Sequence, residues 1–227
     1  MDYTFTSTAN SQADYKVRRS KDEKDEKIVG DFLDNFFYPT FATTITRCTE
    51  KDLQVRGLDV TLSNTDWTIT IDEKAATRWA GRNLQTFAHE VSAINRLGKE
   101  YEGWLLDFNS CSDYLLEVWL DELSSTDNLL HSTKDIKDAT ICLIKKQDLW
   151  SYLKKNNVNS QELKRLGDNL RLNNLYSTYY NGFKVMCLQG IQEKTVNILI
   201  SRNTLINTIS TYAVRYKDGE ITTLRKR

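Results

Sequence analysis

Three charged residues, Asp59, Asp72 and Lys74, have types and a spacing that suit metal-assisted chemistry on a phosphate. Asp59 stands in the apolar run GLDVTL, and the other two stand two positions apart near the end of WTITIDEKA. Hard divalent cations such as Mg²⁺ take carboxylate, phosphate and water oxygens as ligands. A cation bound in this way lowers the pKa of a water molecule, and a neighbouring lysine can orient that water or stabilise negative charge. The chemistry that these residues suit is phosphodiester hydrolysis.

The elements that must position these residues are two strands joined by a turn. Residues 55–63 and 67–75 are predicted to be strands, with the polar residues 64–66 as the turn between them. Because alternate residues of a strand point to opposite faces, Asp72 and Lys74 lie side by side on one face. Pairing across the turn is expected to bring the acid of the first strand next to them.

In this context the residues resemble the PD-(D/E)XK nuclease superfamily, which has the restriction-endonuclease-like fold. GLDV followed by TITIDEK, after the helix-like IVGDFLDNFF, is similar to the family's helix, acid and acid-x-lysine pattern. The resemblance covers about residues 21–120. It implies a central mixed β-sheet flanked by helices and cleavage of DNA or, less often, RNA. It also implies a site that uses Mg²⁺, for which Mn²⁺ can substitute. Carried over, Asp59 and Asp72 are catalytic metal ligands, Lys74 is the catalytic lysine, and the backbone carbonyl of Glu73 is a further ligand.

The pattern departs from that of the family at two positions. Leu58 stands where the family's proline would be, and the second acid is Asp72 where glutamate is commoner. A competing interpretation makes the side chain of Glu73 the ligand, but Glu73 adjoins Lys74 and faces the other way, so alternation favours Asp72.

The non-functional alternative is that the three residues are surface charges on a solvated strand face. An aspartate between Leu58 and Val60 would be costly to bury without a partner or a metal, which favours the functional interpretation of Asp59.

Accessory residues are expected on either side of the motif. Glu26 stands among several acids in the first turn of the predicted helix, Gln54 precedes the first strand, and Glu90 lies in the strand TFAHEVSAI. Each has a structural alternative: charge solvation of a helix turn, a loop amide and a salt bridge on an edge strand, respectively.

A nucleic-acid contact is predicted in AATRWAGRNLQ, directly after the motif. Arg78 and Arg82, four residues apart, are expected to face a phosphate backbone, and Trp79 to stack on a base. The alternative is an ordinary helix surface with a buried tryptophan.

The composition limits the class of protein. The chain has 227 residues with 31 basic and 31 acidic side chains, so a polycation and an acidic tail are excluded, although a basic groove is not. Four widely spaced cysteines and two histidines do not support a zinc ribbon or a histidine-rich metal site. No leader-like apolar region or membrane-length apolar run is found, so a cytoplasmic location with reduced thiols is expected.

The order of elements predicts an α/β or α+β domain around a central mixed sheet. Residues 1–20 are expected to be a flexible arm, and residues 21–227 a single domain. The apolar spacing within 21–39 predicts an amphipathic helix closed by Pro39. Strands are predicted at 86–94, 102–107, 113–120, 138–146, 183–189 and 195–201, and helices at 147–155, 160–174 and 202–210.

The expected function is therefore a Mg²⁺-dependent DNA endonuclease of restriction, phage or mobile-element, repair or defence context, with a homodimer as an alternative to a monomer. Two rival interpretations remain open. One is a noncatalytic nucleic-acid-binding protein on the same fold. The other is an unrelated α+β protein-interaction domain in which the charged residues are incidental.

Overall fold

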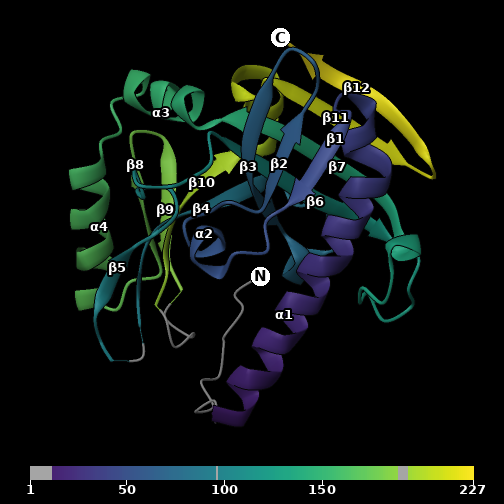
Figure 1. Ribbon diagram of the computed structural model, residues 1–227. Helices are drawn as coiled ribbons and strands as arrows, with labels where there is room; N and C mark the ends of the chain where they lie inside the picture. Colours follow the sequence, from purple (N-terminus) through teal and green to yellow (C-terminus); the bar gives the residue numbers. More distant parts are fainter. Residues whose placement is uncertain (1–11, 96, 189–193) are drawn as a thin grey trace. The chain divides into compact units, whose positions relative to one another are not determined.

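A computed structural model describes residues 12–95, 97–188 and 194–227 (Figure 1). These residues group into two compact units. Unit 1 contains the described residues up to Lys24 together with Ala88–Asp107 and Asn157–Leu199. Unit 2 contains Asp25–Phe87, Phe108–Asn156 and Ile200–Arg227. The prediction of a single domain over 21–227 stays a prediction.

Unit 2 is built around a seven-stranded mixed sheet with the order β1-β2-β3-β6-β7-β11-β12. Its strands are β1 (Thr44–Arg47), β2 (Val60–Ser63), β3 (Thr68–Ala75), β6 (Tyr114–Leu123), β7 (Ile136–Lys145), β11 (Tyr212–Lys217) and β12 (Glu220–Lys226). β3 pairs with β6 in parallel, and the other neighbours pair antiparallel. The prediction of an α+β fold with a central mixed sheet is confirmed.

The hairpin of β2 and β3 forms for local reasons. The side chain of Asn64 accepts hydrogen bonds from the backbone N–H groups of Asp66 at 2.8 Å and Trp67 at 3.1 Å, which closes the turn. In β3 the apolar residues Ile69 and Ile71 pack into the core, and the polar residues between them face the other way. The predicted hairpin and its alternation are confirmed.

One face of this sheet is covered by the helical segment at the start of unit 2. α1 (Gln12–Phe32) continues into a π-helical turn (η1, Leu33–Phe37) and a 3₁₀ turn (η2, Tyr38–Thr40) that contains Pro39. Phe32, Leu33 and Phe37 have no exposed surface and belong to the core cluster with apolar residues of β2, β3, β6, β7 and β11. Burying such side chains contributes about 2 kcal/mol each, so this packing holds β3 in place.

Unit 2 has further short helical segments, of which α3 and η5 bury apolar side chains. They are α2 (Lys51–Val55), α3 (Lys146–Lys155), α5 (Arg202–Thr204) and the turns η3 (Thr77–Trp79), η4 (Thr133–Asp135) and η5 (Leu205–Ile209). Leu149 and Leu153 of α3 and Leu205 and Ile209 of η5 are almost fully buried. α3 begins directly after β7, so its first residue lies at the C-terminal end of that strand.

The second sheet has five strands in the order β5-β4-β10-β9-β8, and most of its residues belong to unit 1. The strands are β4 (Thr86–Ile94), β5 (Glu100–Glu102), β8 (Ser177–Tyr180), β9 (Phe183–Cys187) and β10 (Val196–Ser201), and the helix of this unit is α4 (Ser160–Leu172). Asn159 caps α4 by accepting from the N–H of Glu162 at 2.8 Å. Gly167 lets α4 lie close to the sheet, because a Cβ there would come within 3.2 Å of Val196.

Several predicted boundaries are wrong. The backbone is helical from Gln12, so residues 12–20 are not a loose arm, while residues 1–11 lie outside the described part of the chain. The predicted strand 55–63 shortens to β2, because α2 ends at Val55 and Gly57 adopts a positive φ of 74°. The predicted strand 102–107 turns instead, with the N–H of Leu106 donating to the carbonyl of Gly103 at 2.9 Å. β1, α2, β8, β11 and β12 were not predicted.

Among the described helices, none combines the length and the apolar character needed to cross a membrane. The four cysteines are free thiols.

Candidate active site

The structure brings Asp59, Asp72 and Lys74 together on one face of the seven-stranded sheet. The register of β2 and β3 pairs Val60 with Ile71, so Asp59 and Asp72 are the next residues along the two paired segments. The N–H of Asp59 donates to the carbonyl of Ile71 at 2.9 Å, which continues the ladder up to Asp59. The predicted proximity of the three charges therefore follows from the hairpin.

The electrostatics of this group is dominated by burial. Asp72 is only 1% exposed, and its Oδ1 accepts a hydrogen bond and ion pair from the Lys74 ammonium. Burial raises the pKa of Asp59 to about 7; the charge of Lys74 opposes this shift and the carboxylate of Asp72 adds to it. Burial lowers the pKa of Lys74, but Asp72 and Asp59 outweigh it and hold that pKa above its ordinary value. Asp72 thus has ammonium partners, whereas burial disfavours the charged form of Asp59.

Glu73 points to the opposite face of β3, as alternation predicts. Its carboxylate accepts from the hydroxyl of Tyr38 and from Nη1 of Arg47 at 2.6 Å. Arg47 also donates to Asp34 at 2.8 Å. These side chains form a network that connects β1 and β3 to η1 and η2. The backbone N–H of Glu73 donates to Oδ2 of Asp59 at 2.7 Å, which orients that carboxylate. Arg47 was missed by sequence reasoning because β1 was not recognised.

Glu117 is a second acid that sequence reasoning missed. The parallel register of β3 and β6 places Glu117 directly beside Lys74, so their side chains emerge on the same face. Glu117 has no exposed surface, and its charge, after burial, helps to raise the pKa of the Cys142 thiol. The signal was present in the sequence, because Glu117 is the one charge inside the apolar run LLEVWL.

Lys146, the first residue of α3, also reaches the group. Its Nζ lies 3.9 Å from Oδ2 of Asp72 and donates to the hydroxyls of Ser110 at 2.5 Å and Ser112 at 2.7 Å. Gly57 packs directly against Asp72, because a Cβ at Gly57 would come within 3.0 Å of Asp72 Oδ2. Lys146 was missed because residues 138–146 were predicted to be a single strand.

The three accessory candidates have different surroundings. Glu26 is exposed on α1, and its charge makes a small contribution to the raised pKa of Lys74, after burial, Asp72 and Asp59. Gln54 lies on α2 and not in a loop, and its Nε2 donates to the carbonyl of Cys48 at 2.8 Å. Glu90 lies on the portion of β4 that belongs to unit 1, and its proposed role stays a prediction.

The predicted nucleic-acid contact lies partly in a 3₁₀ turn. Arg78 and Trp79 are in η3, whereas Arg82 follows Gly81, whose φ is 73°, so the two arginines do not share a helix face. Trp79 is 48% exposed, so the alternative of a buried tryptophan is wrong. The guanidinium of Arg82 lies 5.2 Å from the centre of the Trp79 ring.

The donors available to a cation are oxygen atoms. Among the described residues, no three histidine, cysteine, aspartate or glutamate side chains are grouped closely enough to hold a metal. The available set is the carboxylates of Asp59 and Asp72 with the backbone carbonyl of Glu73, the residue after Asp72. Mg²⁺ typically takes one or two carboxylates and completes its coordination with water and phosphate, so this small set fits Mg²⁺.

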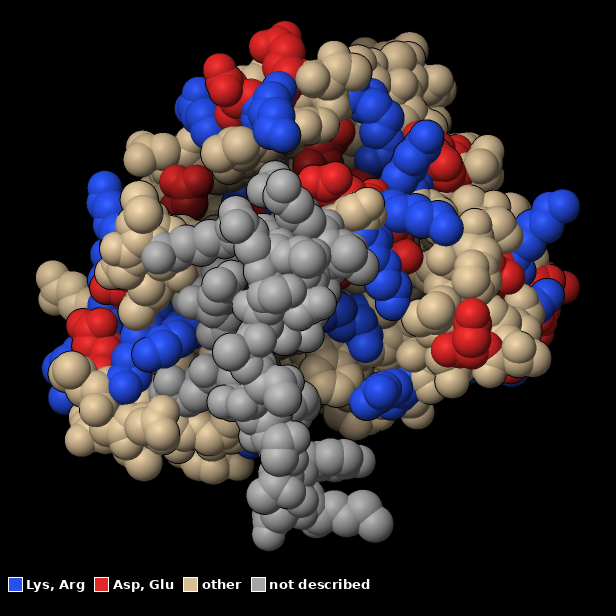
Figure 2. Space-filling model, turned by 90° about the horizontal axis from the view of Figure 1, so that it is seen from below, with Lys and Arg blue, Asp and Glu red and all other residues tan. Residues whose placement is uncertain are grey.

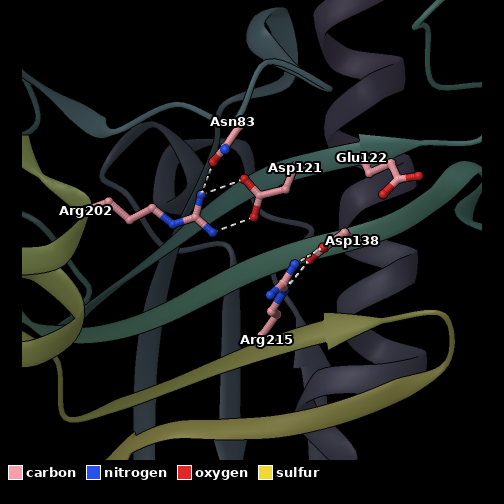
Figure 3. Close-up of a pocket in the computed structure, with 6 residues that line it drawn as sticks. All are labelled: Asn83, Asp121, Glu122, Asp138, Arg202 and Arg215. Carbon is pink, nitrogen blue, oxygen red and sulfur yellow. Dashed lines mark hydrogen bonds and ion pairs between the residues drawn. The ribbon is translucent and has the colours of Figure 1, made fainter.

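A second polar region lies elsewhere in unit 2, in a cavity of about 360 Å³ (Figure 3). It is lined by Asn83, Asp121, Glu122, Asp138, Arg202 and Arg215. Nη1 of Arg202 donates to Oδ1 of Asp121 at 2.6 Å, and Nε of Arg215 donates to Oδ1 of Asp138 at 2.9 Å. We call this region the Arg–Asp pocket.

On the face drawn in Figure 2, basic and acidic side chains are interspersed, in keeping with the formal net charge of +0. Comparisons with family models, with curated proteins and with solved structures found no match to this chain.

Proposed function

We propose that this protein is a Mg²⁺-dependent nuclease that hydrolyses phosphodiester bonds at Asp59, Asp72 and Lys74. The observation that carries the proposal is that Asp59 and Asp72 lie side by side at the end of the β2–β3 hairpin with Lys74 paired to Asp72, while burial raises the pKa of Asp59 to about 7. A divalent cation would favour the charged form of Asp59, which supports a role beyond a structural ion pair. Sequence resemblance to the PD-(D/E)XK superfamily supports the same assignment.

Each residue has a distinct part in the proposed reaction. The carboxylates of Asp59 and Asp72 and the backbone carbonyl of Glu73 would hold Mg²⁺, or Mn²⁺ in its place. The cation, when bound, lowers the pKa of a water molecule and screens the phosphate charge. The backbone N–H of Glu73 orients the Asp59 carboxylate. The Lys74 ammonium, held by Asp72, orients the attacking water or stabilises the charge that develops on the phosphate oxygens.

The wider proposal concerns substrate and setting. DNA is the preferred substrate over RNA, and a restriction, phage, mobile-element, repair or defence setting suits an enzyme of this size. The exposed Trp79 and Arg82 support contact with nucleic acid. A cytoplasmic location with reduced thiols and assembly as a homodimer are part of the proposal; the four free cysteines support the first.

The test is cleavage of plasmid and single-stranded DNA and of RNA, with Mg²⁺ or Mn²⁺ and with EDTA. Wild type is expected to cleave only with the metal, and Lys74→Ala to lose activity while keeping its circular dichroism spectrum. Lys145→Ala, which removes an exposed lysine at the end of β7, is the matched control and is expected to cleave normally. Equal cleavage by wild type and Lys74→Ala would overturn the assignment. Metal-independent binding without cleavage would favour the noncatalytic alternative.

A further inference from the structure

We infer that a subsite for one unpaired nucleotide adjoins the proposed catalytic residues, and that single-stranded nucleic acid is therefore the substrate bound there. The subsite consists of residues 108–112 and the first turns of α3, all of which belong to unit 2. The chemical class of the ligand, a phosphodiester chain, rests on the proposed function. The preference for an unpaired nucleotide rests on the residues described next.

The phosphate-binding part is the ammonium of Lys146 with two hydroxyl groups. Ser110 and Ser112 accept from Nζ at 2.5 and 2.7 Å, and Ser112 is only 6% exposed, so the lysine is held at a defined place and does not extend into solvent. The hydroxyl of Ser110 donates to the carbonyl of Arg56 at 3.2 Å, so the ammonium and the Ser112 hydroxyl are the groups that would donate to a phosphate oxygen. Because Nζ also lies 3.9 Å from Asp72, a phosphate bound here would neighbour the phosphate that is cleaved.

Arg56 and Gly57 join this part to the proposed catalytic residues. Arg56 is exposed, and its Nη2 donates to the carbonyl of Asn109 at 3.3 Å, while its own carbonyl accepts from the N–H of Cys111 at 2.8 Å. Segment 108–112 (FNSCS) carries no charge of its own, and it is flanked by Asp107 and Asp113. A Cβ at Gly57 would meet both Asp72 Oδ2 at 3.0 Å and Ser110 Oγ at 3.1 Å, which shows that the two sites are contiguous.

The base-binding part is a pair of aromatic rings. Phe108 is 72% exposed, and the centre of its ring lies 5.7 Å from that of Trp150. Trp150 is four residues after Lys146 on α3, so both side chains emerge on one face of the helix, about 6 Å apart along its axis. A cation and an aromatic pair at this separation match the phosphate and the base of one nucleotide.

The exposed ring of Phe108 favours an unpaired base over a duplex. Bases in a duplex are stacked on one another, whereas an unpaired base can stack on an aromatic side chain whatever its identity. A ring as exposed as Phe108 gains little from the protein's own core, so its apolar surface is available to a ligand. Single-stranded DNA or RNA, or an unpaired end of a duplex, is the partner that uses both parts.

The experiment measures binding to the full chain in EDTA, by fluorescence anisotropy of a labelled oligothymidylate of about 12 nucleotides and of its duplex with oligoadenylate. Phe108→Ala is expected to weaken single-strand binding about tenfold, and Phe108→Tyr to keep it. Lys146→Ala is expected to reduce the slope of log K against log salt concentration by about 0.7. The matched controls are Tyr179→Ala, which removes an aromatic ring that is 73% exposed in unit 1, and Lys145→Ala.

The outcomes separate this inference from the proposed function. Equal affinity of Phe108→Ala and Tyr179→Ala for the single strand, or tighter binding of wild type to the duplex, would overturn the subsite. Cleavage of the same oligonucleotides with Mg²⁺ is measured separately. Cleavage by wild type with unchanged affinity in Phe108→Ala leaves the proposed function and removes the subsite. Loss of affinity in Phe108→Ala with no cleavage by wild type supports the subsite and removes the proposed function.

Discussion

The proposed active site and the Arg–Asp pocket are both groups of buried charge in unit 2, yet they balance that charge differently. In the pocket each aspartate faces a guanidinium: Asp121 pairs with Arg202 and Asp138 with Arg215 (Figure 3). At the proposed active site, Lys74 and Lys146 both form ion pairs with Asp72, and burial raises the pKa of Asp59. A closed set of pairs is typical of a structural role, whereas a carboxylate that burial disfavours leaves a place for a cation.

Catalysis should separate the two regions most strongly. Asp72→Asn is expected to lower the rate of Mg²⁺-dependent cleavage about a thousandfold, because it removes a ligand charge and the partner of Lys74. Asp121→Asn, the matched change in the pocket, is expected to alter the rate by less than about threefold, since the hydrogen bonds and ion pair of Asp121 are to Arg202 and Thr140. The measurement is single-turnover cleavage, and a similar loss in both variants would contradict the comparison.

The free energy of unfolding should depend strongly on the Arg–Asp pocket, in contrast to the rate of cleavage. Asp121→Ala is expected to lower the free energy of unfolding by about 3 kcal/mol, because it leaves Arg202, whose side chain is 15% exposed, without its carboxylate. Urea unfolding measures this loss. Glu122→Ala is the control within the same pocket, since Glu122 is exposed and is expected to cost less than about 0.5 kcal/mol. A loss for Asp121→Ala no larger than that of the control would show that the pocket is not a structural network.

The charge on Asp59 should destabilise the metal-free fold at neutral pH. The folded pKa of about 7 lies above the unfolded value, so ionisation costs no stability at low pH and its full cost above about pH 7. Asp59→Asn in EDTA is therefore expected to be about 2 kcal/mol more stable than wild type at pH 8, and to show a smaller gain at pH 5. Urea unfolding at both pH values measures the difference.

Asp66→Asn, in the exposed turn between β2 and β3, serves as the control for this prediction. Its effect on unfolding should be the same at both pH values. A gain for Asp59→Asn that does not grow between pH 5 and pH 8 would mean that the charge on Asp59 is already balanced within the protein.

The outer pair of the pocket should give the smallest effect. Asp138→Ala removes the partner of Arg215, whose side chain is 48% exposed and can be hydrated instead. We expect a loss of about 1 kcal/mol in the free energy of unfolding, reduced further in high salt. A loss as large as that of Asp121→Ala would show that exposure of the arginine does not govern the strength of these pairs.

Much of the fold followed from local patterns. Clean alternation predicted β3 within a residue of its observed bounds, the strand predicted at 86–94 matches β4, and apolar spacing predicted the helical segment that packs on the sheet. Short edge strands such as β1 and β12 were not predicted, because their alternation of exposed and half-buried residues carries a weak hydrophobic signal. The boundary at Gly57 was missed because a left-handed residue ends an element without a change in hydrophobicity.

The sequence by itself determined that Asp72 and Lys74 share a strand face, because that depends only on the period of a strand. It also placed Asp59 opposite them, because a hairpin fixes pairing through its turn. Only the tertiary structure decided that Lys146 and Glu117 join the group from α3 and β6. The lone charge in LLEVWL marked Glu117 as unusual, but its neighbours and those of Lys146 depend on strand order and helix docking, which join elements far apart in the chain.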